Sequence, residues 1–111
     1  MEDQFGRDPQ VRYLRGVFGR MEKMQRELLQ QAGVPPVDYR LRRVREAALN
    51  SFEKAWVIAS RRGDIGRDEE EIATIYIHCL AKILSANRIH IPPEALPANE
   101  KISEVLSEVF K

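Results

Sequence analysis

Residues 68–87 read DEEEIATIYIHCLAKILSAN, and this stretch decides the fold. Its apolar side chains cover more than half of the circumference of a helix, which is typical of a central helix enclosed by others. Asp68 is placed as an N-cap, with the capping-box spacing to Glu71 and an acidic first turn that suits the helix dipole. We therefore expect a buried helix that runs to about Asn87. Its apolar residues are Ile72, Ala73, Ile75, Tyr76, Ile77, Cys79, Leu80, Ile83 and Leu84.

Two long amphipathic helices are expected before this one. The first begins at Asp8 and Pro9, because aspartate caps helices and proline suits their first position, and it runs to Gln31 before Gly33 stops it. The second begins at Pro36 or Asp38, runs to Arg62 and ends at Gly63. Spacings of three and four define both apolar faces. These faces are Val11, Leu14, Val17, Phe18, Met21, Met24 and Leu28 in the first helix, and Leu41, Val44, Ala48, Phe52, Ala55 and Ala59, widened by Leu49, Trp56 and Ile58, in the second.

In the last quarter of the chain, the sequence predicts an extended segment, which we call the strap, followed by a short helix. Residues 89–93 should be extended, because proline disfavours helical backbone before it, and residues 93–96 form one short turn of helix. Asn99 then caps a final helix with Ile102, Val105, Leu106 and Val109 on one face. The expected fold is all-α: three long helices plus a short C-terminal fourth in a mostly antiparallel bundle. We expect residues 1–111 to form a single helical domain, with residues 1–7 as a flexible N-terminal tail.

The unequal helix lengths predict that some apolar surface stays uncovered. At about 1.5 Å per residue the first two helices reach roughly 36 Å, and the last stays under about 20 Å. A short fourth helix cannot cover a long hairpin of the first two, so Leu49, Trp56 or Val57 should remain accessible. Uncovered apolar surface indicates a partner or a second copy of the chain, and a homodimer is the default expectation.

The composition indicates a small cytoplasmic protein. The 111 residues include one cysteine, which fits a reducing compartment, and the chain has no apolar run of about 18 residues that would span a membrane. The acidic start, Met1–Gln4, does not resemble a secretory signal. The net charge of +1 divides into +5 for residues 1–63, with 13 basic and 8 acidic side chains, and −4 for residues 64–111, with 5 and 9. We favour pairing between the halves within the molecule, or an arginine-rich genome composition, over recruitment of a charged partner.

Arginines at the start of the second helix give the leading functional hypothesis. Arg40, Arg42, Arg43 and Arg45 crowd its first turns, where positive charge opposes the helix dipole and acidic neighbours would compensate. We interpret them as steering an acidic partner, with Leu49 and Trp56 supplying buried contact, although a core position is the commoner state of a tryptophan. The chain is then a non-enzymatic protein–protein interaction module: a small adaptor, regulator or accessory subunit.

Nucleic-acid binding is the alternative, and it is less favoured. Arg12, Arg15, Lys23 and Arg26 share the outer face of the first helix with Gly16 and Gly19. Glycines there would let a phosphate backbone or another helix approach, although a kinked helix with its arginines in water is the commoner explanation. The isoelectric point of about 7.9 is low for such a protein, and no helix-turn-helix or zinc signature occurs.

Metal, cofactor and enzyme chemistry are not expected. His78 and Cys79 point about 100° apart on a helix and cannot converge on one ion. We expect Cys79 to be a buried small hydrophobe, His90 to be a loop residue that bonds backbone, and His78 to lie on the polar side of its helix with Glu71, Thr74 and Lys82. No nucleophile signature or phosphate-binding loop occurs.

Overall fold

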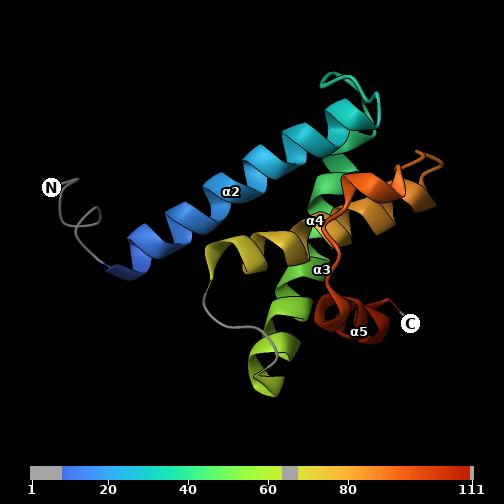
Figure 1. Ribbon diagram of the computed structural model, residues 1–111. Helices are drawn as coiled ribbons and strands as arrows, with labels where there is room; N and C mark the ends of the chain where they lie inside the picture. The colour runs from blue at the N-terminus through green and yellow to red at the C-terminus, as the bar shows by residue number, and fades with distance from the viewer. Residues whose placement is uncertain (1–8, 64–67, 111) are drawn as a thin grey trace, which may run out of the picture.

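The structure, a computed structural model, describes residues 9–63 and 68–110. Four α-helices and one 3₁₀ turn make up this part of the chain, which contains no strand (Figure 1). The all-α bundle predicted from the sequence is confirmed. The proposed cap at Asp8 and the tail at residues 1–7 lie outside the described residues. The elements are α2 (Pro9–Gln31), α3 (Leu41–Arg62), α4 (Glu69–Ala86), η1 (Pro93–Ala95) and α5 (Glu100–Val109).

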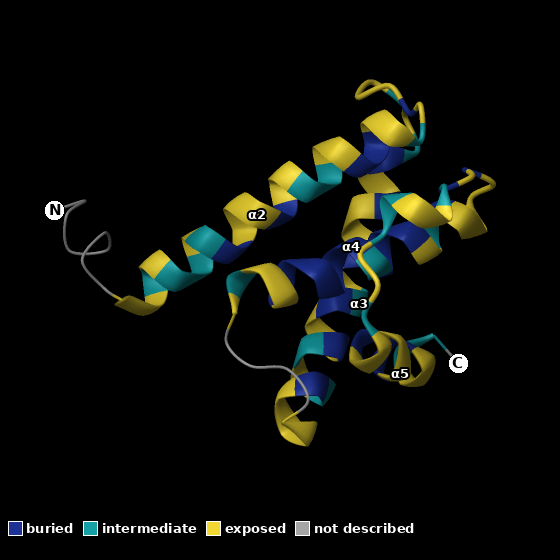
Figure 2. Ribbon diagram, in the orientation of Figure 1, coloured by how far each residue is buried: buried dark blue, intermediate teal, exposed yellow. Residues whose placement is uncertain are grey.

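Helix α4 is the centre of the bundle. It packs against α2, α3 and α5, and Figure 2 shows it as the element with the most buried surface. Thr74 is buried as well, which is possible because its hydroxyl donates to the Glu70 carbonyl at 2.7 Å. The enclosed helix expected from the sequence is therefore confirmed. Its buried residues are Ile72, Ala73, Thr74, Ile75, Tyr76, Ile77, Cys79, Leu80, Ala81 and Leu84.

Helices α2 and α3 pack on α4 rather than along each other. They share a turn at one end and diverge from it (Figure 1), so the long hairpin assumed from the sequence does not form. Because α4 is apolar around most of its circumference, each long helix buries more of its own apolar face on α4 than on the other long helix. Met21 and Leu28 of α2 and Phe52 and Ala55 of α3 are buried in this core.

The helix ends follow local chemistry. Helix α3 begins at Leu41, later than the sequence suggested, because Asp38 folds a turn in which its carboxylate accepts from the Arg40 amide at 2.9 Å. The helix ends at Gly63, which has a φ of 69°, as predicted. The Asp68 carboxylate accepts from the amides of Glu70 at 2.7 Å and Glu71 at 3.2 Å, and this confirms the predicted cap.

The C-terminal segment forms the predicted strap and short helix. Residues 89–92 form an extended segment whose Ile89 and Ile91 side chains are buried, and the single turn η1 follows it. The side chain of Asn99 accepts from the Ile102 amide at 3.2 Å, which confirms the cap of α5. Through Ile102, Val105 and Leu106, α5 closes the bundle against α3 and α4.

A matched pair of valine substitutions tests this core. Val105 is fully buried and Val37 is 87% exposed. We expect Val105→Ala to lower the free energy of unfolding by about 2 kcal/mol, since it removes buried methyl groups and leaves a cavity. The same change at Val37 should cost less than about 0.5 kcal/mol. Chemical denaturation followed by circular dichroism measures both, and equal effects would contradict this account of the packing.

Candidate interaction surface

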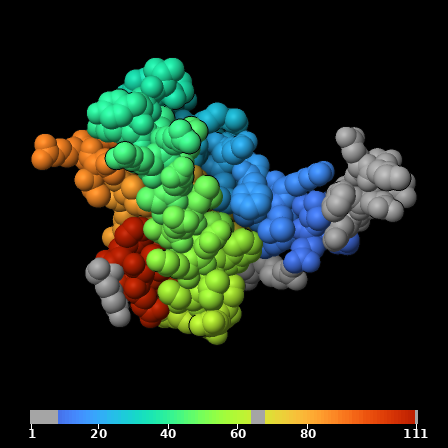
Figure 3. Space-filling view, turned by 180° about the vertical axis from the view of Figure 1, so that it is seen from behind, coloured from blue at the N-terminus to red at the C-terminus, as the bar shows by residue number. Residues whose placement is uncertain are grey.

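A groove opens where α2 and α3 diverge, and α4 forms its floor. Its volume is about 320 Å³. Figure 3 shows this side of the molecule, with α3 in green beside α2 in blue. Phe18 of α2 and Leu49 of α3 stand at its rim with 47% and 41% of their surfaces exposed. The groove is lined by Phe18, Met21, Glu22, Gln25, Arg45, Leu49 and Tyr76.

The exposure of Phe18 corrects the sequence interpretation, which placed this residue in the core. Val17 and Met21 point at α4, whereas Phe18 comes about 100° further round the helix and projects over the groove. Leu49 and Val57 are exposed, as predicted from the lengths of the helices. Nothing in the hydrophobic periodicity separates Phe18 from its buried neighbours, because the outcome depends on the direction in which α3 leaves the turn.

A polar chain connects the core to the groove. With the Gln25 amide oriented so that its nitrogen faces Tyr76, this nitrogen donates to the Tyr76 hydroxyl, and the amide oxygen accepts from Arg45 Nε at 3.0 Å and Nη2 at 3.2 Å. Burial raises the pKa of Tyr76 to about 12, so its hydroxyl stays protonated. Gln25 thereby fixes the guanidinium of Arg45 at the side of the groove.

Further along α3, the surface continues over Trp56. The Trp56 ring packs on Phe52 with the centroids 5.3 Å apart, and Phe52 meets Tyr76 edge-on at 6.0 Å. Trp56 is half-buried, so it belongs to the core on one side. Its other side borders a shallow hollow of about 520 Å³ with Glu53 and Val57. We use the term α3 face for the stripe Arg42, Arg45, Leu49, Glu53 and Trp56.

The four clustered arginines differ in their surroundings. Arg40 is held within the molecule: its Nε and Nη2 donate to the Asp38 carboxylate at 3.0 and 2.6 Å, and its Nη1 donates to the Asn87 carbonyl at 3.4 Å. This pairing lowers the pKa of Asp38 to about 2. Arg42 and Arg43 are exposed, and Arg42 lies 4.0 Å from Glu46. Arg45 is exposed beside Gln25 and Leu49 in the groove.

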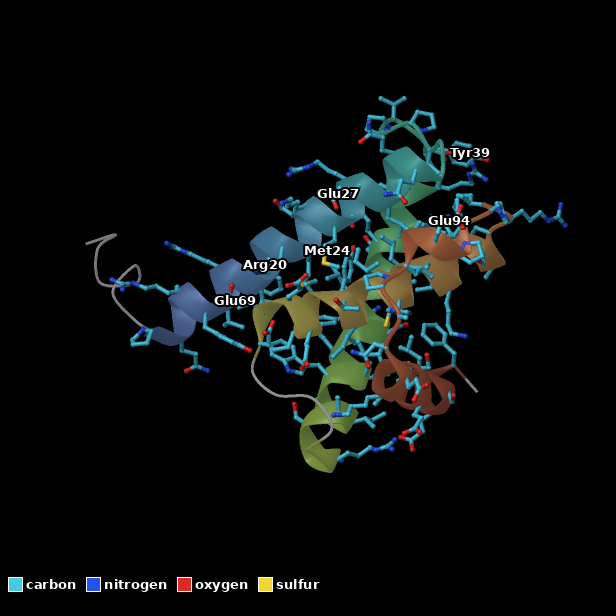
Figure 4. All side chains as sticks on the ribbon, in the orientation of Figure 1. Arg20, Met24, Glu27, Tyr39, Glu69 and Glu94 are labelled. Atoms are coloured by element: carbon cyan, nitrogen blue, oxygen red, sulfur yellow. The ribbon has the colours of Figure 1, made fainter. Side chains whose placement is uncertain are left out.

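The four basic residues on the outer face of α2, Arg12, Arg15, Lys23 and Arg26, are exposed, but Gly16 does not belong to that surface. A Cβ at Gly16 would lie 2.6 Å from the Glu69 carboxylate, so this glycine lets the start of α4 approach α2. Figure 4 shows Arg20 and Glu69 at this crossing, where Arg20 Nε lies 3.4 Å from Glu69 Oε2. Gly19 has open space around it.

Several ion pairs join the basic half of the chain to the acidic half. Besides Arg20 and Glu69, Arg62 of α3 lies 3.2 Å from Glu104 and 3.4 Å from Glu108 of α5. These contacts agree with the favoured explanation of the uneven charge. Arg42, Arg43 and Arg45 take no part in these ion pairs with α4 and α5, and they remain exposed as basic surface.

The histidines and the cysteine carry no shared site. On the side of α4 where His78 was expected, Glu71 and Lys82 are exposed, whereas Thr74 is buried. His78 is half-buried: its Nε2 is 2.7 Å from the Pro97 carbonyl, and burial lowers its pKa. His90 is exposed, so the histidine that contacts backbone is His78. Cys79 is buried as predicted, and burial raises its pKa to about 12. Within residues 9–63 and 68–110 no group of His, Cys, Asp or Glu side chains is arranged to hold a metal ion.

Comparison of the chain with protein-family models, with curated proteins and with solved structures found no match. The functional argument therefore rests on the surface itself. Among the described helices, none is long and apolar enough to cross a membrane.

Sequence reasoning had named Arg42, Arg45, Leu49 and Trp56, and the structure brings these four into one stripe. It did not select Glu53 as a contact residue, although Glu53 lies four residues after Leu49 and on the same side of the helix. It also missed Phe18. The regular spacing from Leu49 could have predicted that Glu53 belongs to this surface. No sequence feature predicts that Phe18 does.

The pair of Arg40 and Asp38 makes a prediction about pH. Because the pKa of Asp38 is about 2 in the folded protein against an ordinary value of 3.8, the pair stabilises the fold above about pH 4, and this contribution is lost as the pH falls toward 2. We expect Arg40→Gln to lower the unfolding temperature at pH 6 and to have little effect at pH 2. Thermal unfolding measures this, with Arg43→Gln as the control. A loss that is the same at both pH values would contradict the role of the pair.

The buried thiol makes a second prediction. Because Cys79 is inaccessible and its pKa is about 12, it should react with a thiol reagent at pH 8 only as fast as the protein unfolds. We expect full reaction within minutes in denaturant and almost none in native buffer. Rapid labelling of the native protein would show that α4 is not enclosed.

Proposed function

We propose that this chain is a non-enzymatic protein–protein interaction module that docks its partner on the α3 face. One observation carries the proposal: Leu49 and Phe18 are large apolar side chains left exposed on opposite sides of one groove, and Arg45 lines the same groove. Surface of this kind is typical of contact sites. A small cytoplasmic adaptor, regulator or accessory subunit is the class of protein that fits it.

Apolar and charged residues would have different parts in docking. Burial of Leu49 and Phe18, together with the free side of Trp56, would supply most of the affinity, since tryptophan and other large side chains dominate contact energies. Arg45 lines the groove, and Arg42 and Arg43 are exposed in the preceding turn of α3, so these three would orient an approaching acidic group. Arg40 contributes indirectly, because it fixes the turn from which α3 starts.

A second candidate, nucleic-acid binding, rests on the outer face of α2. Arg15, Lys23 and Arg26 are exposed there beside the open Gly19. The same helix exposes Glu22 and Glu27, which would repel phosphate, so we rank this candidate below protein binding. A mobility shift at low salt that Lys23→Glu and Arg26→Glu abolish would reverse this order.

Site-specific cross-linking tests the docking proposal in living cells. A photoreactive amino acid placed at Leu49 should form a covalent adduct of defined mass, because a docked partner covers this residue. The same amino acid placed at Lys101, an exposed position on α5, should not. Adducts with a second copy of the chain or with another polypeptide both fit the proposal. Equal labelling at the two positions, or none at Leu49, contradicts it.

A further inference from the structure

The α3 face is symmetric about Leu49. Arg45 and Glu53 lie four residues before and after it, and Arg42 and Trp56 lie seven residues before and after it. Steps of four and seven residues return to nearly the same side of a helix, so all five side chains form one stripe. Four of them are exposed and Trp56 is half-buried. The stripe spans about 21 Å along the helix.

We propose that the partner on this face is a second copy of the chain, whose α3 docks antiparallel across a two-fold axis at Leu49. This inference rests on the proposed function. An antiparallel pair centred on Leu49 places Arg45 opposite Glu53 of the other copy, Arg42 opposite Trp56, and Leu49 opposite itself. A two-fold axis makes each unlike contact occur twice, which is the self-complementary pattern of a closed dimer.

Each contact in this arrangement is favourable. Arg45 and Glu53 form an ion pair, and the guanidinium of Arg42 reaches the face of the Trp56 ring that is not packed on Phe52. The two Leu49 side chains meet at the centre, and Phe18 of each copy borders them across the groove. A parallel pairing would instead set Arg45 against Arg45 and Glu53 against Glu53. Charge therefore selects the antiparallel orientation.

The charged groups of the stripe are available for these contacts. Arg45 uses Nε and Nη2 for Gln25, which leaves the Nη1 donors and fixes the side chain in position. Arg42 has only a loose contact of 4.0 Å with Glu46. Glu53 takes part in none of the ion pairs among the described residues. A uniformly acidic partner would meet repulsion from Glu53, so a second copy fits the stripe better.

Charge reversal provides the test, with the dimer dissociation constant measured by sedimentation equilibrium. The native chain should dimerise. Arg45→Glu and Glu53→Arg, each alone, should weaken the dimer by roughly tenfold or more, because each sets like charges opposite one another twice. An equimolar mixture of the two variants should dimerise again, since every reversed charge then faces an opposite one. Lys54→Glu, on another side of α3, is the matched control and should leave the constant unchanged.

The outcomes separate this inference from the proposed function. Recovery of the dimer on mixing supports the antiparallel pairing and shows that both variants are folded. A native chain that is monomeric at all concentrations, a dimer insensitive to either reversal, or single variants that do not recover on mixing each overturn it. If the chain is monomeric while Leu49 cross-links to a different polypeptide, only the second-copy inference fails. If Leu49 forms no adduct, the docking surface itself fails.

Discussion

The rest of the structure depends on the burial of α4. This helix is apolar around most of its circumference, with Ile75, Ile77 and Leu80 pointing in different directions and all of them enclosed. No single neighbour can cover such a helix, so three others pack on it. The strap that carries Ile89 and Ile91 covers apolar surface that remains. Because the apolar surface of α4 must be buried on several sides, α2 and α3 each pack on α4 and diverge, instead of pairing along their length.

The interaction surface is a consequence of this arrangement. When α2 and α3 each face α4, the groove between their outer sides has no element left to fill it, and Phe18 and Leu49 remain at its rim. Tyr76 of α4 lines the floor of the groove. Gln25 forms hydrogen bonds both to the Tyr76 hydroxyl and to the Arg45 guanidinium, so it links the two residues. The core therefore sets the position of a charged side chain on the surface. Such pre-positioning lowers the entropic cost of docking.

Local chemistry explains which features were predictable from the sequence. The limits of α4 and α5 follow from Asp68 and Asn99, whose side chains bond amides within their own first turns. The end of α3 follows from Gly63 in the same way. The start of α3 was predicted too early, because Asp38 bonds the Arg40 amide and holds a turn that helix propensity does not reveal. Signals that act within a few residues can be read from the sequence, as these cases show.

Contacts between distant segments were not predictable in this way. Gly16 was assigned to an outer basic face, but Glu69, more than fifty residues later, lies against it. Arg40 was assigned to a partner, but the Asn87 carbonyl and Asp38 hold it. Phe18 was assigned to the core, and the angle between two helices decides its exposure. In the candidate site, the residues on one helix were largely identified, whereas the contribution of α2 required the structure.

Amide hydrogen exchange at several protein concentrations tests the central claim, that an enclosed α4 leaves the outer face of α3 as the contact surface. We predict that the α4 amides exchange slowest at every concentration, since they open only on global unfolding. Among the amides that exchange by local opening, protection that rises with concentration should be confined to residues 42–56 of α3 and to α2 near Phe18. Exchange in α4 as fast as in α2, or concentration-dependent protection on α5 instead of α3, would contradict the account.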